Sequence, residues 1–456
     1  MSGSEPHIPF LSAGSYPLRA GNRVRPFVDG EAAFRRICEA VEAAQHSVWI
    51  TVAFFAEFQM PGGRGSSLDV LDRAAARGLD VRLIVWRPNP ETGIVGNTFP
   101  GSAENHEMLR TRGSRFRVRW DRALGRYCQH QKSWVIDAGD PAEIAFVGGM
   151  NLTSKGMGAR GHAGGIGRHD VYLEIAGPAA TDVHHNFVQR WNEASERHAA
   201  DGVWGHTGGD DLPFPTRVSA RQGGAPVQIQ RNLPPGHYSD GTATPGGDAY
   251  DVARGERSVT EQYVQAIAAA RRSIYIENQA LPIPEISVPL QAALERGVEV
   301  MYLAPAEPEP YVRRDRKDPQ HRERFERITA LGRYPNFSLA GIAATNEAGQ
   351  RASIYVHSKM MLVDDAWATI GSCNLHAYSL FGHSEMNATF WDPAVVRALR
   401  CELLAEHLGE DTAALDDRAA LALYRRVAQD NRRLRDCGNP DWRGLAFSLD
   451  PATYAD

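Results

Sequence analysis

The sequence has only five cysteines in 456 residues, and none of them forms a Cys-x-x-Cys pair. Because they are widely separated and odd in number, they provide neither a disulfide framework nor a zinc-binding signature. We therefore expect buried free thiols in a reducing compartment. The five positions are Cys38, Cys128, Cys373, Cys401 and Cys437.

Long apolar runs and an excess of positive charge are also missing. No apolar run reaches the roughly 18 residues of a transmembrane helix, and residues 1–21 lack the basic and apolar regions of a signal peptide. The formal net charge is −5, which argues against a nucleic-acid partner without excluding a local basic cleft. We expect a cytoplasmic protein that meets any lipid substrate from the aqueous side, through peripheral contact with the membrane.

What is present is the composition of a globular protein with a sizeable core, 43% hydrophobic and 23% charged. Residues 1–25 are rich in Gly, Pro and Ser, and we expect them to be irregular. Helical spacing over 31–45 precedes an apolar strand at 47–55, and a helix at 67–77 precedes a strand at 81–86. This alternation predicts an α/β fold with mainly parallel sheets covered by helices.

The same order of elements then occurs a second time, offset by roughly 220 residues. A segment rich in Gly, Pro and Asp, residues 201–225, separates the two copies and is interpreted as a linker. We predict two similar α-β-α sandwich halves, residues 1–200 and 226–456, the second ending in C-terminal helices. Duplicated halves commonly pack about a pseudo-twofold axis, which would place the active site at their interface.

One short motif, His-x-Lys followed by four residues and Asp, occurs once in each half. In both copies an apolar strand, a Gly turn and an Asn follow it. A single His-x-Lys would be a chance occurrence in most proteins, but two copies with the same spacing and the same sequel indicate function. The residues are His130, Lys132, Asp137 and Asn151 in the first half, and His357, Lys359, Asp364 and Asn374 in the second.

This set of side chains suits chemistry at a phosphodiester. Ammonium groups and amides can hold phosphoryl oxygens and stabilise the charge of the transition state, so no metal or other cofactor is expected. One imidazole can attack phosphorus to form a phosphohistidine, while the other protonates the leaving alcohol. The spacing does not tell which histidine does which. Asp137 and Asp364 lie five residues beyond each lysine, on the opposite face of a strand, and are interpreted as structural anchors.

Each histidine also needs a partner on its other ring nitrogen to fix its tautomer. Asp170 and Glu385 occupy matching places downstream of the two motifs. We expect each to orient the histidine of the opposite half, Asp170 with His357 and Glu385 with His130.

At this point the sequence resembles the phospholipase D superfamily. The paired motifs HQKSWVID and HSKMMLVD carry the resemblance, together with GGMNLTS, GSCNL and the segment IYIENQ at 274–279. The resemblance implies that His130 is the nucleophile and His357 the general acid, with the two lysines and two asparagines binding phosphate. It implies hydrolysis of glycerophospholipids, or transfer of the phosphatidyl group to another alcohol.

One departure from the family pattern concerns Tyr378, which stands where many members have Arg. This puts headgroup specificity in doubt but not the chemistry at phosphorus. The alternatives are a nuclease or small-molecule phosphodiesterase of the same superfamily, and a non-catalytic phosphate- or lipid-binding scaffold. A scaffold would be expected to lose a His or Lys from one motif, and neither is lost. We expect a monomer, because the duplication supplies both motifs in one chain.

Overall fold

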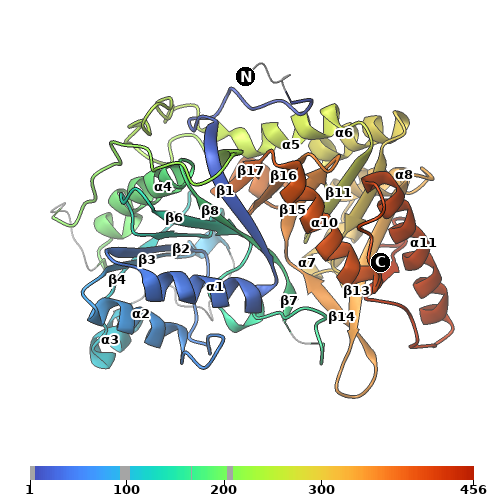
Figure 1. Ribbon diagram of the computed structural model, residues 1–456, viewed down its shortest axis with the longest axis horizontal. Helices are drawn as coiled ribbons and strands as arrows, with labels where there is room; N and C mark the ends of the chain where they lie inside the picture. The colour runs from blue at the N-terminus through green and yellow to red at the C-terminus, as the bar shows by residue number, and fades with distance from the viewer. Residues whose placement is uncertain (1–5, 93–102, 166, 203–208) are drawn as a thin grey trace.

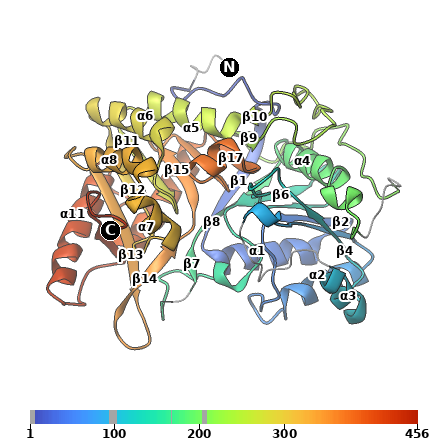
Figure 2. The same cartoon turned by 180° about the vertical axis from the view of Figure 1, so that it is seen from behind.

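The computed structural model describes residues 6–92, 103–165, 167–202 and 209–456. The two halves of the chain lie side by side in the view of Figure 1, blue and green on one side and yellow to red on the other, and the reverse view in Figure 2 agrees. Each half contains a β-sheet with helices packed against it.

In the first half, the helices are α1 (Gly30–Ala43), α2 (Ser67–Ala76), α3 (Ala103–Arg112) and α4 (Ala180–Asn192). The strands are β1 (Arg19–Val28), β2 (Ser47–Val52), β3 (Asp80–Trp86), β4 (Arg117–Asp121), β5 (Ser133–Ile136), β6 (Ile144–Gly148), β7 (Arg168–His169) and β8 (Val171–Ala176).

In the second half, the helices are α5 (Ser258–Ala269), α6 (Pro284–Glu295), α7 (Pro310–Lys317), α8 (Arg322–Leu331), α9 (Ala377–Phe381), α10 (Pro393–Leu408) and α11 (Asp417–Asp436). The strands are β9 (Ala225–Leu233), β10 (Glu256–Arg257), β11 (Ser273–Asn278), β12 (Glu299–Leu303), β13 (Phe337–Thr345), β14 (Arg351–Val356), β15 (Lys359–Val363), β16 (Trp367–Gly371), β17 (Glu385–Phe390) and β18 (Ala446–Ser448).

The two sheets have matching strand orders. Hydrogen bonds connect β4-β3-β2-β5-β6-β8-β1 in the first half and β13-β12-β11-β15-β16-β17-β9 in the second. The last strands of the two series, β1 and β9, also pair with each other. The duplication inferred from the sequence is therefore present in three dimensions. The halves are joined edge to edge as well as face to face.

The expectation of mainly parallel sheets is wrong in detail, because both sheets are mixed. Parallel pairing is confined to β2-β3-β4 and β11-β12-β13 within these two series. From β5 and β15 onward the strands pair antiparallel. For β5-β6 and β15-β16 the physical reason is the short connection after each motif, since a turn of a few residues can join only antiparallel neighbours, whereas a parallel neighbour needs a long crossover.

Residues 1–25 are also not irregular throughout, since β1 begins at Arg19 and pairs with β8 and β9. Its sequence, RAGNRVRPFV, alternates buried and exposed positions over part of its length, a pattern that the local Gly and Pro content obscured.

We retain as a proposal the prediction that residues 201–225 form the linker between the two halves. Residues 203–208 of that expected linker lie outside the described residues.

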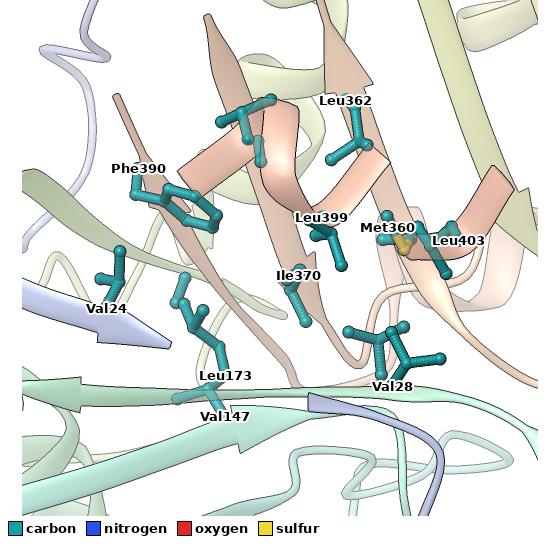
Figure 3. Packing of buried hydrophobic residues seen from close by; sticks show 14 of the residues in the cluster. Val24, Val28, Val147, Leu173, Met360, Leu362, Ile370, Phe390, Leu399 and Leu403 are labelled. Atoms are coloured by element: carbon teal, nitrogen blue, oxygen red, sulfur yellow. The ribbon is translucent and has the colours of Figure 1, made fainter. Parts of the chain in front are cut away.

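The largest hydrophobic cluster lies between the halves. Val147 on β6 and Leu173 on β8 belong to it, as do Ile370 on β16 and Phe390 on β17. Figure 3 shows the residues of the first half across from those of the second, with Leu399 of α10 beside them. Because both sheets contribute one face to this shared core, neither half buries that face without the other.

Separate clusters cover the two outer faces. In the first half α1 and α2 pack on the sheet, and in the second half α5, α6 and α8 do so. Among the described residues, no helix is both long enough and apolar enough to cross a bilayer.

The shared core leads to a stability prediction. Leu173→Ala removes a fully buried side chain from the inter-half cluster and should lower the free energy of unfolding by about 2–5 kcal/mol. Val288→Ala, at an exposed position of α6, is the control and should change it by less than about 0.5 kcal/mol. Urea denaturation monitored by circular dichroism measures both. Equal small effects would mean that the two halves do not share this core.

Candidate active site

The two motifs meet because each is hydrogen-bonded to a segment of the opposite half. The His130 N–H donates to the Ser384 carbonyl at 2.9 Å, just before β17, and the His357 N–H donates to the His169 carbonyl at 2.8 Å, just before β8. Each histidine backbone is thus paired with the residue that precedes Glu385 or Asp170. This register brings every motif histidine beside the carboxylate of the other half.

The side chains then pair crosswise. His130 Nδ1 lies 2.9 Å from Glu385 Oε2, and His357 Nδ1 lies 2.6 Å from Asp170 Oδ2. These are the pairs expected from the sequence. Because the carboxylates accept at Nδ1, the Nε2 atom of each ring is left for a substrate. His130 is 9% exposed and His357 6% exposed, so only a small part of each residue is accessible to solvent.

Both carboxylates are fully enclosed. Glu385 accepts hydrogen bonds at 2.5 Å from the hydroxyls of Ser372 and Ser379, and burial raises the pKa of its carboxyl. Burial also raises the pKa of Asp170 to about 6, although the charge of Lys359 opposes that shift. The nearby lysines and hydroxyl or backbone N–H donors favour the ionised form of both groups.

The two lysines are more completely buried than the two histidines. Lys132 Nζ donates to the His130 carbonyl at 2.5 Å, and Lys359 Nζ donates to Gln279 Oε1 at 2.6 Å and to the His357 carbonyl. Burial lowers the pKa of Lys132 to about 8 and that of Lys359 well below its usual value. An anion entering the site would restore the tendency of both amines to be charged.

The histidines respond to the same environment. Burial lowers the pKa of both His130 and His357 well below 6.5, and the charges of both lysines lower each of them further. The pKa of each imidazole therefore depends on both lysines, one from each half. In the absence of an anion these shifts favour neutral imidazoles, which is the form in which Nε2 can act as a nucleophile.

The two asparagines follow the strands that pair with the motif strands, Asn151 after β6 and Asn374 after β16. Asn151 Oδ1 accepts from the Phe54 N–H at 3.0 Å. Asn374 Oδ1 is buried and has no hydrogen-bond partner among the described residues. In the first case the carbonyl oxygen is occupied, so it is the amide NH2 that is available to a phosphoryl oxygen.

Asp137 and Asp364 lie at equivalent turns after β5 and β15, where each adopts a φ of 56°. Asp137 accepts from the backbone N–H groups of residues 45–47, and Asp364 accepts from those of residues 271–273. These N–H groups precede or open β2 and β11. Both carboxylates thus fasten the strand that carries a motif to its neighbour, outside the cleft.

His169 was not among the residues expected from the sequence. It is fully buried, and its ring nitrogens lie 3.1 Å from Asp29 Oδ1 and 3.1 Å from Glu277 Oε2. These two carboxylates outweigh the effect of burial and raise its pKa well above 6.5. Glu277 also accepts from the Ser358 hydroxyl at 2.6 Å, next to His357. The raised pKa favours a charged imidazolium at His169, whose backbone carbonyl accepts from the His357 N–H and which directly precedes Asp170.

Within the described residues, two groups have the spacing of metal ligands: Asp29, His162 and His169, and His169, Glu277 and His407. Both groups contain His169, whose two ring nitrogens are already hydrogen-bonded to Asp29 and Glu277. They are buried behind the second motif. We interpret them as one ion-pair network rather than as a metal centre.

Comparisons with known proteins show the family to which the chain belongs. A family model described as "Cardiolipin synthase, PLD-like domain" matches residues 37–191 and 263–406, and one described as "Phospholipase D" matches residues 162–282. The two segments of the first match contain one His-x-Lys motif each. Together they cover more than half of the chain.

Curated relatives include phospholipase D A of Dictyostelium discoideum, 26% identical over 459 residues, which cover 82% of this chain and 33% of that protein. A cardiolipin synthase of Listeria monocytogenes serotype 4b is 23% identical over 86% of this chain and 70% of its own length. Cardiolipin synthase A of Pseudomonas entomophila is 27% identical over 79% of this chain and 64% of its own. The chain thus spans a third of the first relative and about two thirds of the others.

A likeness at the level of fold comes from the crystal structure of phosphatidylserine synthase from Haemophilus influenzae. It aligns with a TM-score of 0.56 at 12% sequence identity, covering 85% of this chain and 88% of that one.

The buried His169 cation leads to a pH prediction. Because its folded pKa is raised above 6.5, its charge contributes stability that is complete below about pH 6.5 and is lost as the pH rises through the folded value. His169→Gln should therefore lower the melting temperature most at about pH 6, and by a smaller amount at about pH 9. Thermal unfolding of both proteins at the two pH values measures this. If His169→Gln lowered the melting temperature more at about pH 9 than at about pH 6, this would contradict a charged His169.

Proposed function

The chain belongs to the phospholipase D superfamily, and from this premise we propose that it is a phosphatidyltransferase and phosphodiesterase acting on glycerophospholipids through a phosphohistidine. The observation that carries the proposal is the crosswise pairing of His130 with Glu385 and of His357 with Asp170. It supplies two imidazoles in one cleft, each with its Nε2 atom free for a reacting group.

In the first step, His130 Nε2 attacks phosphorus and the bond between phosphorus and the leaving oxygen breaks. His130 becomes positively charged as the P–N bond forms, and the Glu385 carboxylate stabilises that charge through Nδ1. The amines of Lys132 and Lys359 and the amides of the two asparagines bind the phosphoryl oxygens. The ammonium groups supply the positive charge that a metal ion provides in other phosphoryl-transfer sites, and the neutral amides add hydrogen bonds.

The leaving alkoxide takes a proton from His357 Nε2. A phosphodiester carries a negative charge, so its arrival beside His357 raises the pKa of an imidazole that burial and the lysines otherwise hold neutral. Asp170 at 2.6 Å then stabilises the imidazolium. Without substrate, the site therefore favours the neutral form of His130, which is the nucleophile. With a phosphodiester bound, it favours the protonated form of His357, which is the general acid.

In the second step, an incoming hydroxyl gives its proton to His357, and its oxygen attacks phosphorus as the P–N bond breaks. Water as acceptor gives hydrolysis, and an alcohol gives a new phosphodiester. Two relatives are named cardiolipin synthases and a third is named phospholipase D. All three names favour a phospholipid donor, and the name cardiolipin synthase favours an alcohol as the acceptor.

A direct test uses phosphatidylcholine vesicles with excess ethanol and EDTA. Wild type should release choline and form phosphatidylethanol, and His130→Ala should be slower by at least about 10³-fold because no nucleophile remains. Mass spectrometry of the lipids measures the product. If wild type leaves every phospholipid intact but cleaves single-stranded DNA or a small diester, the lipid assignment is wrong.

The orienting carboxylates give a second test. Glu385→Gln keeps the shape of the side chain but removes the charge that stabilises the His130 intermediate, so kcat should fall by about 10²- to 10⁴-fold with little change in KM. Steady-state kinetics on the same lipid measures this.

The matched control is Glu143→Gln, because Glu143 pairs with His184 at 3.1 Å in a buried position outside the cleft. It should leave kcat within a few-fold of wild type. A Glu385→Gln protein as active as this control would show that the crosswise pair does not support catalysis.

A further inference from the structure

Three large apolar side chains that remain exposed lie on the segments that precede His130 and Glu385 in the chain. Leu124 is 45% exposed, Tyr378 45% and Phe381 37%, and we call these three residues the entrance rim. They come from the segment before the first motif and from α9, which lies between Asn374 and Glu385. Three other large apolar side chains of the described chain are comparably exposed but dispersed: Met108, Val218 and Val288.

The two segments of the entrance rim are fastened together. The Cys128 N–H donates to His383 Nδ1 at 3.0 Å, and the Ser384 N–H donates to the Cys128 carbonyl at 3.0 Å. The Tyr127 ring lies directly over Gly382, where an added Cβ would come within 2.0 Å of it. Because the segments pack so closely, Leu124, Tyr378 and Phe381 belong to one surface and not to two independent loops.

A row of aromatic rings connects this surface to the nucleophile. The His130 and His383 ring centroids are 5.8 Å apart, and His383 stacks on Tyr378 with centroids 5.8 Å apart. Tyr127 lies 6.1 Å from Tyr378 in an edge-to-face arrangement. The exposed Tyr378 ring is therefore separated from the His130 ring by the His383 ring alone. Whatever the entrance rim contacts is held next to the opening of the cleft.

Cationic side chains accompany these apolar ones. The Arg257 guanidinium lies 4.3 Å from the centroid of the Phe381 ring, and Arg126 is exposed two residues after Leu124. Glu261 is close enough to Arg257 and Arg254 for their charges to affect its pKa, so the surface is not uniformly basic. Aromatic rings bordered by arginines are the side chains that proteins place at the boundary between lipid headgroups and acyl chains.

We propose that the entrance rim is the surface with which the protein contacts a phospholipid bilayer containing anionic headgroups. The inference rests on the proposed function, because the diester of a membrane lipid lies at headgroup level while its acyl chains stay in the bilayer. The surface around the cleft must then sit on the bilayer. Leu124 and Phe381 enter the boundary with the acyl chains, and Arg126 and Arg257 contact lipid phosphates.

The size of the surface favours a bilayer over another protein. A stable dimer buries about 800 Å² on each partner, which takes about 20–30 residues. Three side chains from two short segments provide much less than that. A bilayer needs only a few inserted apolar side chains with electrostatic attraction to anionic lipids.

The test compares two double variants. Leu124→Ser with Phe381→Ser removes two apolar side chains of the entrance rim and leaves Tyr378 in its stack on His383. Met108→Ser with Val288→Ser removes two side chains of similar exposure, 40% and 47%, from α3 and α6. Sedimentation with vesicles made of equal parts phosphatidylcholine and phosphatidylglycerol measures binding. The first variant should bind roughly tenfold or more weakly than wild type, and the second as wild type does.

A soluble diester separates docking from chemistry. All three proteins should cleave bis(4-nitrophenyl) phosphate at the same rate, while turnover of lipid in vesicles falls only in the first variant. Equal vesicle binding by the two double variants would overturn the proposal, as would a wild type that does not bind vesicles. So would a wild-type dimer that only the first variant dissociates, since that assigns the surface to a second copy of the chain. A wild type that binds vesicles through the entrance rim but cleaves no diester would instead contradict the proposed function alone.

Discussion

The crosswise pairing of each motif histidine with a carboxylate of the other half is the constraint on which the active site depends. Neither half contains a complete set: the first holds His130 but not Glu385, and the second holds His357 but not Asp170. The backbone bonds from His130 to Ser384 and from His357 to His169 fix the register of this exchange. The shared hydrophobic core and the pairing of β1 with β9 hold the halves at the required distance.

Burial gives the site its electrostatic character. Two lysines and two histidines are buried close together, and burial lowers the pKa of all four groups. An anionic phosphodiester raises these pKa values again, because it stabilises the charged forms of the same groups. Without substrate, the lowered pKa values favour the neutral forms of these side chains, which reduces the repulsion among them. When the substrate brings its negative charge, their charged forms become favourable. This explains how a chain with net charge −5 can present a phosphate site.

The sequence predicts much of this arrangement because the repeated motif is local and strongly patterned. His130, Lys132, His357 and Lys359 follow from spacing, and the carboxylate pairs follow from the duplication together with a pseudo-twofold axis. His169 could not be found in this way, since its partners Asp29 and Glu277 are 140 and 108 residues distant in sequence. Its one signal was its place before Asp170. β1 was missed because local composition outweighed its pairing with β8, and the mixed sheets were missed because helix alternation indicates only the parallel part.

Trapping the covalent intermediate tests the roles assigned to the two histidines most directly. Wild type is mixed with a short-chain phosphatidylcholine, quenched with alkali within the first turnover, digested, and mapped by mass spectrometry at high pH, where phosphohistidine survives. We expect a phosphatidyl or phosphoryl group on the peptide that contains His130, and no such group in His130→Ala. The group on the His357 peptide would reverse the roles, and no modified histidine in a protein that turns over substrate would contradict the covalent mechanism.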